Sequence, residues 1–308
     1  MDLSDRSRAI KELAVKAGFH HCGLSSAIAL SEEKDHYLTW LDKKHWGIMD
    51  YLRRNLDKRL DPHLVMPEAR TVIALLVSYF SGIEIASEDN LLIARYARGR
   101  DYHVRVRERL NDLASGLKNA FPGSTCRPFV DSGIIMEKAW AQRCGVGWRG
   151  KNSLLVNKTH GSWFFIGILL TDLETAYDTP ETDHCGNCDR CLRACPTGAL
   201  ESPHVLNPLK CIAYHTIEIK GDIPGEFRGR FSNRIFGCDI CQEVCPFNSK
   251  PLVNSDPDCL PDPHLTHMRK RDWENLTRDE FDRVFDGTPV IRTGYETLVR
   301  NIRFVTGK

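Results

Sequence analysis

The chain has 308 residues, enough for two domains, and its 42% hydrophobic and 27% charged residues are typical of a globular protein. The formal net charge of +1 neither requires a nucleic-acid partner nor excludes one. The N-terminus lacks the basic and apolar segments of a signal peptide, and no apolar run is long enough to span a bilayer, so we expect neither export nor a membrane partner.

The first part of the chain predicts a helix and then a strand. Apolar residues recur at helical spacing over residues 4–17, and residues 19–24 are typical of a short strand. The run His20-His21-Cys22 lies in this strand. Because neighbouring side chains on a strand point to opposite faces, we expect no metal site there.

Two more helices are predicted at residues 33–45 and 48–57. The continuous apolar run at residues 71–80 is rich in β-branched residues, which predicts a buried strand of a sheet.

An arginine-rich segment leads into the next predicted helix, which ends near residue 120. Six arginines fall between Arg95 and Arg109, against only Asp101 and Glu108. Guanidinium groups match phosphate oxygens in pairs, so the segment is either a surface for an anionic ligand or a solvated helix face. Composition alone does not favour one over the other.

A strand at residues 125–130 is predicted to end in Asp131-Ser132-Gly133, before a helix at 135–144. An aspartate at such a turn is most often a helix N-cap. Residues 145–150 match G-x-G-x-x-G, but a helix precedes them rather than a strand, so we expect no dinucleotide site. Residues 153–157 and 162–171 predict a hairpin turned around His160 and Gly161.

Two cysteine runs dominate the second half of the chain. The first is C-x₂-C-x₂-C-x₃-C-P, from Cys185 to Pro196, and the second is C-x₂-C-x₃-C-P, from Cys238 to Pro246. In the bacterial ferredoxin pattern, three closely spaced thiolates hold one [4Fe–4S] cluster, and the cysteine before the proline ligates the other cluster. The two runs therefore predict two [4Fe–4S] clusters.

The same crossover divides eight cysteines into two sets of four. The first set is Cys185, Cys188, Cys191 and Cys245. The second set is Cys195, Cys211, Cys238 and Cys241. Cys211 is placed by completing the count, because no spacing rule identifies it.

Zinc and disulfides explain these cysteines less well. Zinc sites commonly use two C-x₂-C pairs rather than a triple followed by Cys-Pro, and disulfides suit small secreted proteins. The remaining Cys22, Cys126, Cys144 and Cys259 lie outside any motif, and we expect reduced structural thiols. Oxygen-labile clusters and free thiols indicate a cytoplasmic protein.

After the cysteines, residues 256–263 are rich in proline and aspartate and predict a linker. Helical patterns resume at residue 272, and a last helix is predicted at 294–304.

Across nearly its whole length, the sequence resembles the epoxyqueuosine reductases, cobalamin-dependent enzymes of tRNA modification. The motifs that carry the resemblance, besides the cysteine runs, are ARYARGRDYH (94–103), VDSG (130–133), EKAW (137–140), GWRGKN (147–152), GSWFF (161–165), TDL (171–173) and NRIFGC (233–238).

The resemblance implies an α+β fold in three parts. Residues 1–178 would form a cobalamin-binding catalytic domain like that of reductive dehalogenases, and residues 179–255 a ferredoxin-like domain with two [4Fe–4S] clusters. Residues 256–308 would form a linker and C-terminal helices. The cofactors would be base-off cobalamin and the clusters, which pass single electrons to cobalt.

The resemblance also implies roles for single residues. Asp131 falls on the family's catalytic acid, which would protonate the epoxide oxygen as its C–O bond breaks; we expect burial to raise its pKa. Arg59, Asn152 and Ser153 would lie along the corrin, with Asp131. Arg98 and Lys220 are candidates for contacts with tRNA or cofactor phosphates.

The implied reaction reduces epoxyqueuosine in tRNA to queuosine with two electrons and two protons. The implied partners are that tRNA and an external low-potential electron donor, and we expect a monomer. Many family members continue into helical repeats that help to hold tRNA, whereas this sequence stops at Lys308, as a short or truncated form would.

Two alternatives share part of this pattern. Another corrinoid reductase, such as a reductive dehalogenase, would have the same cofactors but act on a small molecule. A two-cluster electron carrier would hold iron and sulfide but no corrin.

Overall fold

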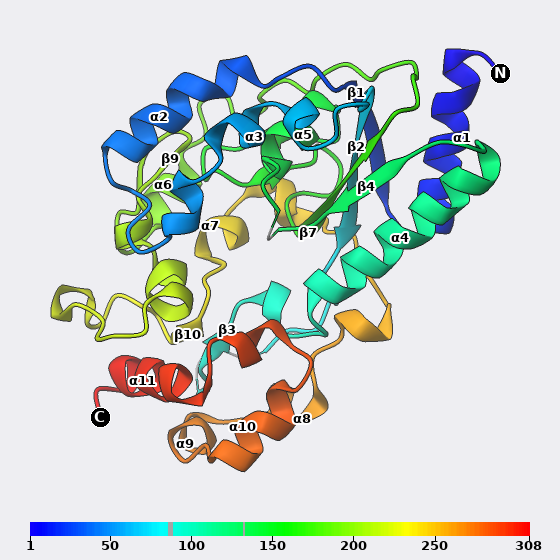
Figure 1. The fold of residues 1–308 in the computed structure, drawn as a ribbon. Helices are drawn as coiled ribbons and strands as arrows, with labels where there is room; N and C mark the ends of the chain where they lie inside the picture. Colours follow the sequence, from blue (N-terminus) through cyan, green and yellow to red (C-terminus); the bar gives the residue numbers. More distant parts are fainter. Residues whose placement is uncertain (86–88, 132) are drawn as a thin grey trace.

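The computed structural model describes residues 1–85, 89–131 and 133–308, so Ser132 of the VDSG motif lies outside the described residues. The fold is α+β, as expected from the sequence (Figure 1). A four-stranded sheet forms the upper part of Figure 1, and a group of short helices forms the lower part.

The sheet is antiparallel and has the order β1-β2-β7-β4. Its strands are β1 (His21–Ser26), β2 (Thr71–Ser78), β7 (Phe164–Thr171) and β4 (Cys126–Phe129). Every residue of β2 is buried, because this strand is paired on both sides and covered on both faces. The predicted buried strand at 71–80 is therefore confirmed.

Side chains of β2 alternate between two apolar cores. Ile73 and Leu75 pack with α1 (Leu3–Lys16) and α4 (Tyr102–Ala120) on one face of the sheet. Ala74 and Leu76 pack on the other face with Trp140 and Ala141 of α5 (Glu137–Arg143). This period of two is what a continuous apolar run needs in a sheet covered by helices on both sides.

Shorter elements surround this sandwich. Before β2 come two helices, α2 (Lys34–Asp42) and α3 (Leu56–Leu60). A small ribbon joins β5 (Trp148–Arg149) to β6 (Leu155–Val156). The cysteine-rich segment contributes α6 (Arg190–Ala194), β8 (Leu200–Ser202), β9 (Val205–Leu206) and α7 (Ile240–Glu243).

The last part of the chain folds around a segment from the first half. The two-residue strand β3 (Leu92–Ile93) pairs in parallel with β10 (Arg234–Phe236) (Figure 1). Leu91 and Ile93 are buried in one core with apolar residues of the C-terminal helices. Those helices are α8 (Pro263–His267), α9 (Lys270–Glu274), α10 (Arg278–Phe285) and α11 (Tyr295–Thr306).

Two local predictions are wrong. Residues 48–57 do not form one helix, because Asn55 adopts a left-handed backbone (φ 55°) between a short 3₁₀ turn and α3. The predicted turn around His160 and Gly161 forms, with one antiparallel bridge between Asn157 and Gly161, but residues 153–157 and 162–171 do not continue it as a paired hairpin. Instead β6 pairs with β5, and β7 is inserted between β2 and β4, because its apolar residues complete both cores of the large sheet.

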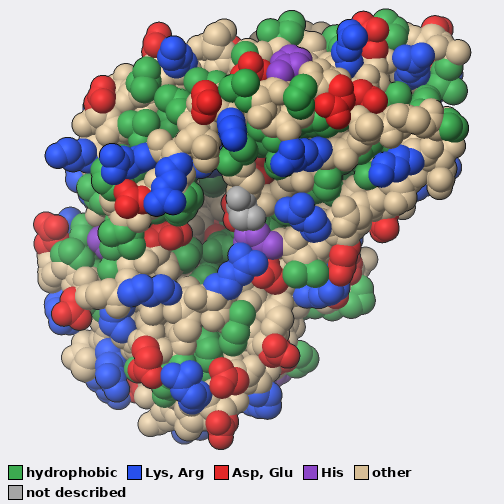
Figure 2. All heavy atoms as spheres, in the orientation of Figure 1, with side chains coloured by type: hydrophobic (Ala, Val, Ile, Leu, Met, Phe, Trp, Pro, Cys, Tyr) green, Lys and Arg blue, Asp and Glu red, His purple; other side chains and the backbone are tan. Residues whose placement is uncertain are grey.

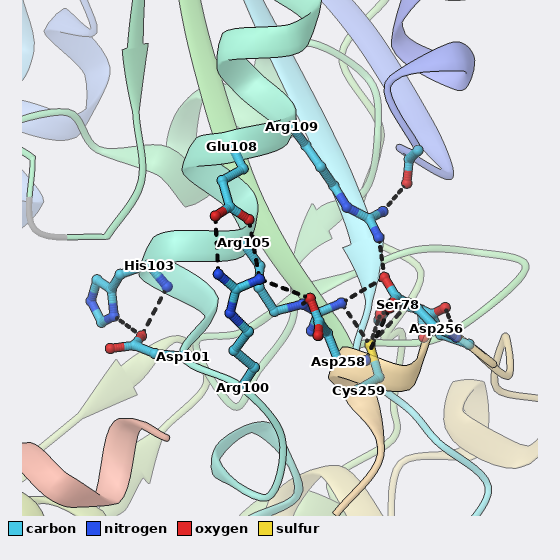
Figure 3. Close-up of polar contacts among 12 residues, drawn as sticks. Ser78, Arg100, Asp101, His103, Arg105, Glu108, Arg109, Asp256, Asp258 and Cys259 are labelled. Carbon is cyan, nitrogen blue, oxygen red and sulfur yellow. Dashed lines mark hydrogen bonds and ion pairs between the residues drawn. The ribbon is translucent and has the colours of Figure 1, made fainter. Parts of the chain in front are cut away.

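The arginine-rich segment is largely neither an anion surface nor a solvated face. Three of its arginines hold the linker after the cysteine region against α4 (Figure 3). The buried Arg105 donates to Asp256 at 3.0 Å and to the sulfur of Cys259 at 3.1 Å, and Arg109 also pairs with Asp256. Arg100 bridges Glu108 and Asp258 near the surface.

Within the described ranges, none of the helices combines the length and the apolar character that crossing a membrane requires.

Candidate active site

The fold brings cysteines of both runs close together, and the division into two ligand sets stays a prediction. In the first set, burial raises the pKa of Cys245, and the charges of Cys185 and Cys188 act in the same direction. Burial also raises the pKa of Cys191, which interacts with Cys185 and Cys245. Cys245 therefore lies near enough to Cys185, Cys188 and Cys191 for their charges to interact, although it is far from them in the sequence.

The second set forms in the same way around Cys211. Burial raises the pKa of Cys241, and Cys238 and Cys211 add to this effect. Burial raises the pKa of Cys211 as well, with Cys195 acting in the same direction. Cys211 thus lies near enough to Cys195 and Cys241 for their charges to interact. Ligation of iron by either set stays a prediction.

The two sets of thiols lie in different surroundings. Cys245 borders an open surface hollow with Arg190 and Arg193. All four cysteines of the second set instead line a cavity of about 370 Å³ between the sheet and the cysteine-rich segment. Figure 2 shows the molecular surface hollowed near its middle, with basic side chains around the opening.

The wall of this cavity combines apolar and acidic groups. Aromatic residues form much of it, and the acidic residues Asp131, Glu137 and Asp239 line it together with Lys138. The aromatic residues are Tyr79, Tyr96, Tyr102, Phe164 and Phe165. An apolar cavity with a few convergent polar groups is the usual form of a cofactor or substrate site.

Asp131 follows β4 directly and adopts a left-handed backbone with φ of 48°. The N-cap of α5 is Met136, so the interpretation of Asp131 as a helix cap is wrong. One carboxylate oxygen of Asp131 accepts hydrogen bonds from the hydroxyl of Tyr102 at 2.6 Å and from Nε2 of His103 at 2.8 Å. A non-glycine residue in such a conformation is uncommon and marks a position worth functional attention.

The expectation of a raised pKa at Asp131 is wrong for this structure. Burial acts to raise its pKa, but the hydrogen bonds from His103 and Tyr102 lower it by more, so the net direction is downward. The opposite holds for His103. Burial acts to lower its pKa, whereas bonds to Asp131 and Asp101 raise it, so the net direction is upward. The proton shared by this pair therefore rests on the imidazole.

A chain of charged groups continues outward from His103. Its Nδ1 is 2.7 Å from Asp101, whose other carboxylate oxygen pairs at 2.9 Å with Arg292, just before α11. Sequence reasoning gave His103 and Arg292 no role. His103 lies inside a motif that carries the resemblance, but its partners come from three separate segments, which no local pattern reveals.

Glu137 is a second acid that sequence reasoning missed. Burial and, to a smaller extent, the neighbouring Asp131 together raise its pKa to about 8. Its Oε1 is buried without a hydrogen-bond partner among the described residues. The signal was present in the EKAW motif, but the motif alone does not show that its glutamate faces the cavity.

The three predicted corrin contacts occupy different environments. Asn152 lines the cavity and donates to the carbonyl of Cys241 at 3.4 Å. Ser153 has φ of 63° and a buried hydroxyl without a partner among the described residues. Arg59 does not line the cavity: it is buried and donates to the carbonyls of Tyr51 at 2.9 Å and Arg54 at 3.2 Å.

The two predicted tRNA contacts are already engaged within the protein. Arg98 is only 8% exposed and donates to the carbonyl of Ile93 at 2.9 Å. This burial argues against a direct contact of Arg98 with tRNA. Lys220 is exposed, with its amine 2.8 Å from the carbonyl oxygen of Thr293.

Two family models match separate parts of the chain. The model described as "Epoxyqueuosine reductase QueG, DUF1730" matches residues 59–132. The model described as "4Fe-4S double cluster binding domain" matches residues 184–248, which contain both cysteine runs.

Curated relatives match over nearly the full chain. The epoxyqueuosine reductase of Cellulophaga algicola is 42% identical, with 97% of each chain covered. That of Cyclobacterium marinum is 40% identical over 98% of this chain and 97% of its own. The Escherichia coli enzyme is 35% identical over 100% of this chain and 82% of its own.

Solved structures agree in fold. An epoxyqueuosine reductase with an epoxyqueuosine-modified tRNA-Tyr stem loop superposes with a TM-score of 0.91 at 29% identity, covering 98% of this chain and 81% of its own. A Bacillus subtilis epoxyqueuosine reductase, whose catalytic aspartate loop is swung out of the active site, gives a TM-score of 0.89 at 28% identity, with 98% and 81% covered.

Proposed function

Because this chain belongs to the epoxyqueuosine reductase family, we propose that it reduces the epoxide of epoxyqueuosine in tRNA to give queuosine. The observation that carries the proposal is the cavity, which joins Asp131 and Glu137 to the second set of thiols within one chamber. The solved relative with a modified tRNA stem loop supports tRNA as the substrate.

The thiols fit two iron–sulfur clusters. Cysteine thiolates in sets of four are the usual ligands of [4Fe–4S] clusters, and the two sets provide one each. The first set, beside a surface hollow, suits entry of electrons from an external low-potential donor. The second set, which lines the cavity, suits their delivery. Bound clusters would supply one-electron transfer.

The cavity also fits a cobalamin. Its aromatic wall suits the face of a corrin, and the partnerless oxygens of Glu137 and Ser153 suit polar groups at the corrin's edge. Asn152 lines the same cavity. When bound, cobalamin would supply a low-potential centre for reductive chemistry. We propose the base-off form, with Asp131 close to the reacting carbon atoms.

The protein's own part in the reaction is to move protons. Opening the epoxide and releasing its oxygen as water consumes two electrons and two protons, and leaves an alkene. A positioned acid is needed because an alkoxide leaves poorly. Asp131 faces the cavity, and its carboxylate oxygen lies 2.8 Å from Nε2 of His103, so a proton on that nitrogen can move to the carboxylate. Nη1 of Arg292 lies 3.2 Å from the same nitrogen.

We further propose the domain division 1–178, 179–255 and 256–308, a monomeric enzyme and a cytoplasmic location. The packing of Leu91 and Ile93 with the C-terminal helices adds that the first domain reaches into the third.

The decisive test is anaerobic turnover of tRNA that carries epoxyqueuosine, with a low-potential reductant and with or without added cobalamin. We expect queuosine only when cobalamin is present, as measured by mass spectrometry of digested tRNA. Asp131→Asn should retain its iron and cobalt and lose turnover. Full iron without any cobalamin binding would instead support a two-cluster electron carrier.

A further inference from the structure

The position of the Glu137 carboxyl group suits a role in the chemistry of the cavity rather than in stabilising the fold. Glu137 begins α5 and lines the cavity wall. The backbone of Asp131 is close enough to act on the pKa of this carboxyl group, so the two acids are neighbours. Its Oε1 is buried and makes no hydrogen bond within the described residues, although a buried polar atom ordinarily has a partner.

Charged groups from three segments face Glu137. Asp131 and burial disfavour its ionised form, while Lys138 on the same helix and Arg59 of α3 favour it. Tyr102 of α4 is close enough for the charge of Glu137 to act on the phenol. The unfavourable effects are larger, so the pKa of Glu137 rises to about 8 and the group is mostly protonated at neutral pH.

Asp131 by itself does not meet the proton demand of the proposed reaction. Its Oδ2 already accepts two hydrogen bonds, and its pKa is lowered. The pair of Asp131 and His103 can supply one proton per turnover before it is recharged, whereas reduction of an epoxide to an alkene and water consumes two.

We propose that Glu137 is a second acid of the cavity, which holds the proton that the departing oxygen takes up second. This inference rests on the proposed function. The first C–O bond breaks as the oxygen is protonated from the side of Asp131 and His103, giving a hydroxyl group. The second C–O bond breaks as Glu137 gives its proton to that hydroxyl group, which leaves as water.

The two electrons for these steps come from the external low-potential donor. Glu137 ends the turnover as a carboxylate, and a proton from solvent restores it before the next one. The carbon atoms that lose the oxygen become the alkene, so atoms, charge and electrons balance.

Infrared spectroscopy tests the protonation state without turnover. The spectrum of the iron-loaded chain should show the carbonyl band of a protonated carboxyl group at pH 7, which disappears as the pH rises through about 8. The band should be missing from Glu137→Gln and present in Glu12→Gln, a matched change on the exposed face of α1. A carboxylate at position 137 throughout pH 6–9 overturns the proposal.

Turnover kinetics test the role. Glutamine keeps the size and the hydrogen-bonding capacity of a protonated glutamate but cannot give up a proton. In Glu137→Gln we expect kcat to fall by about 10²-fold or more, with KM for the stem loop unchanged. We expect wild-type kcat to decline above pH 8 as Glu137 loses its proton, and this decline to be absent from Glu137→Gln. A purely structural role predicts wild-type kcat in Glu137→Gln, which overturns the proposal.

The two tests separate this inference from the proposed function. If wild-type protein does not act on epoxyqueuosine, the proposed function fails, and the infrared titration still decides whether Glu137 holds a proton. If wild type acts and Glu137→Gln acts equally well, only the second acid is refuted.

Discussion

The ion pairs between α4 and the linker at residues 256–263 allow a quantitative test of what attaches the C-terminal part of the chain to the sheet. Arg105 has a side chain that is 6% exposed, and it bonds to Asp256 at 3.0 Å, Asp258 at 3.4 Å and the sulfur of Cys259 at 3.1 Å. Arg105→Met keeps most of the aliphatic volume and removes the charge. The change therefore isolates the polar contacts.

Removing one partner of a buried ion pair costs about 3–5 kcal/mol. Arg109 still pairs with Asp256 in the variant, so we expect the lower end, about 3 kcal/mol. For a chain of this size, that loss corresponds to a fall in Tm of about 6 °C. The control is Arg100→Met, whose ion pairs are half-exposed and are expected to contribute at most about 1 kcal/mol.

Urea and thermal unfolding, followed by circular dichroism, measure both variants. The difference in the free energy of unfolding between wild type and Arg105→Met should also become smaller in acid. Burial acts to raise the pKa of Asp256, but the Asp258 backbone N–H and Arg105 lower it by more. Its stabilising effect is therefore present above the unfolded pKa of about 3.9 and is lost as the pH falls through the lower folded value. Equal losses of unfolding free energy in Arg105→Met and Arg100→Met would refute this reasoning.

Three further predictions concern the site. Cys211→Ala should reduce iron from about eight to about four per chain, since it removes one ligand of the second set; unchanged iron and sulfide would exclude Cys211 as a ligand. His103→Gln should destabilise the fold at pH 6 but not at high pH. The raised pKa of His103 gives a stabilisation that is complete below about 6.5 and lost as the pH rises through the folded value, which paired urea titrations measure. Gly99→Ala should loosen the linker, because its Cβ would lie 2.4 Å from the carbonyl oxygen of Asp258; wild-type Tm would contradict this.

Sequence reasoning succeeded where a feature is encoded locally. The apolar run of β2 depends on neighbouring residues, and the buried strand lies where it was predicted. The regular spacing of the cysteines is also local, and its match to a double-cluster family model agrees with the prediction of two clusters. Sequence reasoning failed where distant segments decide the outcome. Arg105 meets Asp256 and Asp258 only after the chain has passed through the sheet and the cysteine region.

The same limit applies to the acids of the cavity. The expectation for Asp131 considered burial but not the hydrogen bonds from Tyr102 and His103, which reverse the direction of its pKa shift. Glu137 departs from an ordinary glutamate because burial and Asp131 oppose its charge together. Each pKa shift adds up the effects of groups on different helices and strands. A sequence pattern can name these groups, but it does not give the distances between them.

The parallel pairing of β3 with β10 has a consequence for synthesis on the ribosome. Leu92 pairs with Arg234, so β3 can form this pairing only after about 140 further residues have been made. At about 5–20 residues per second, this takes roughly 7 to 28 s. During this interval Leu91 and Ile93 have no core to join, because their apolar neighbours belong largely to the last helices. The nascent chain therefore cannot complete this pairing, or bury Leu91 and Ile93 in their shared core, until β10 and the helices that follow it have been made.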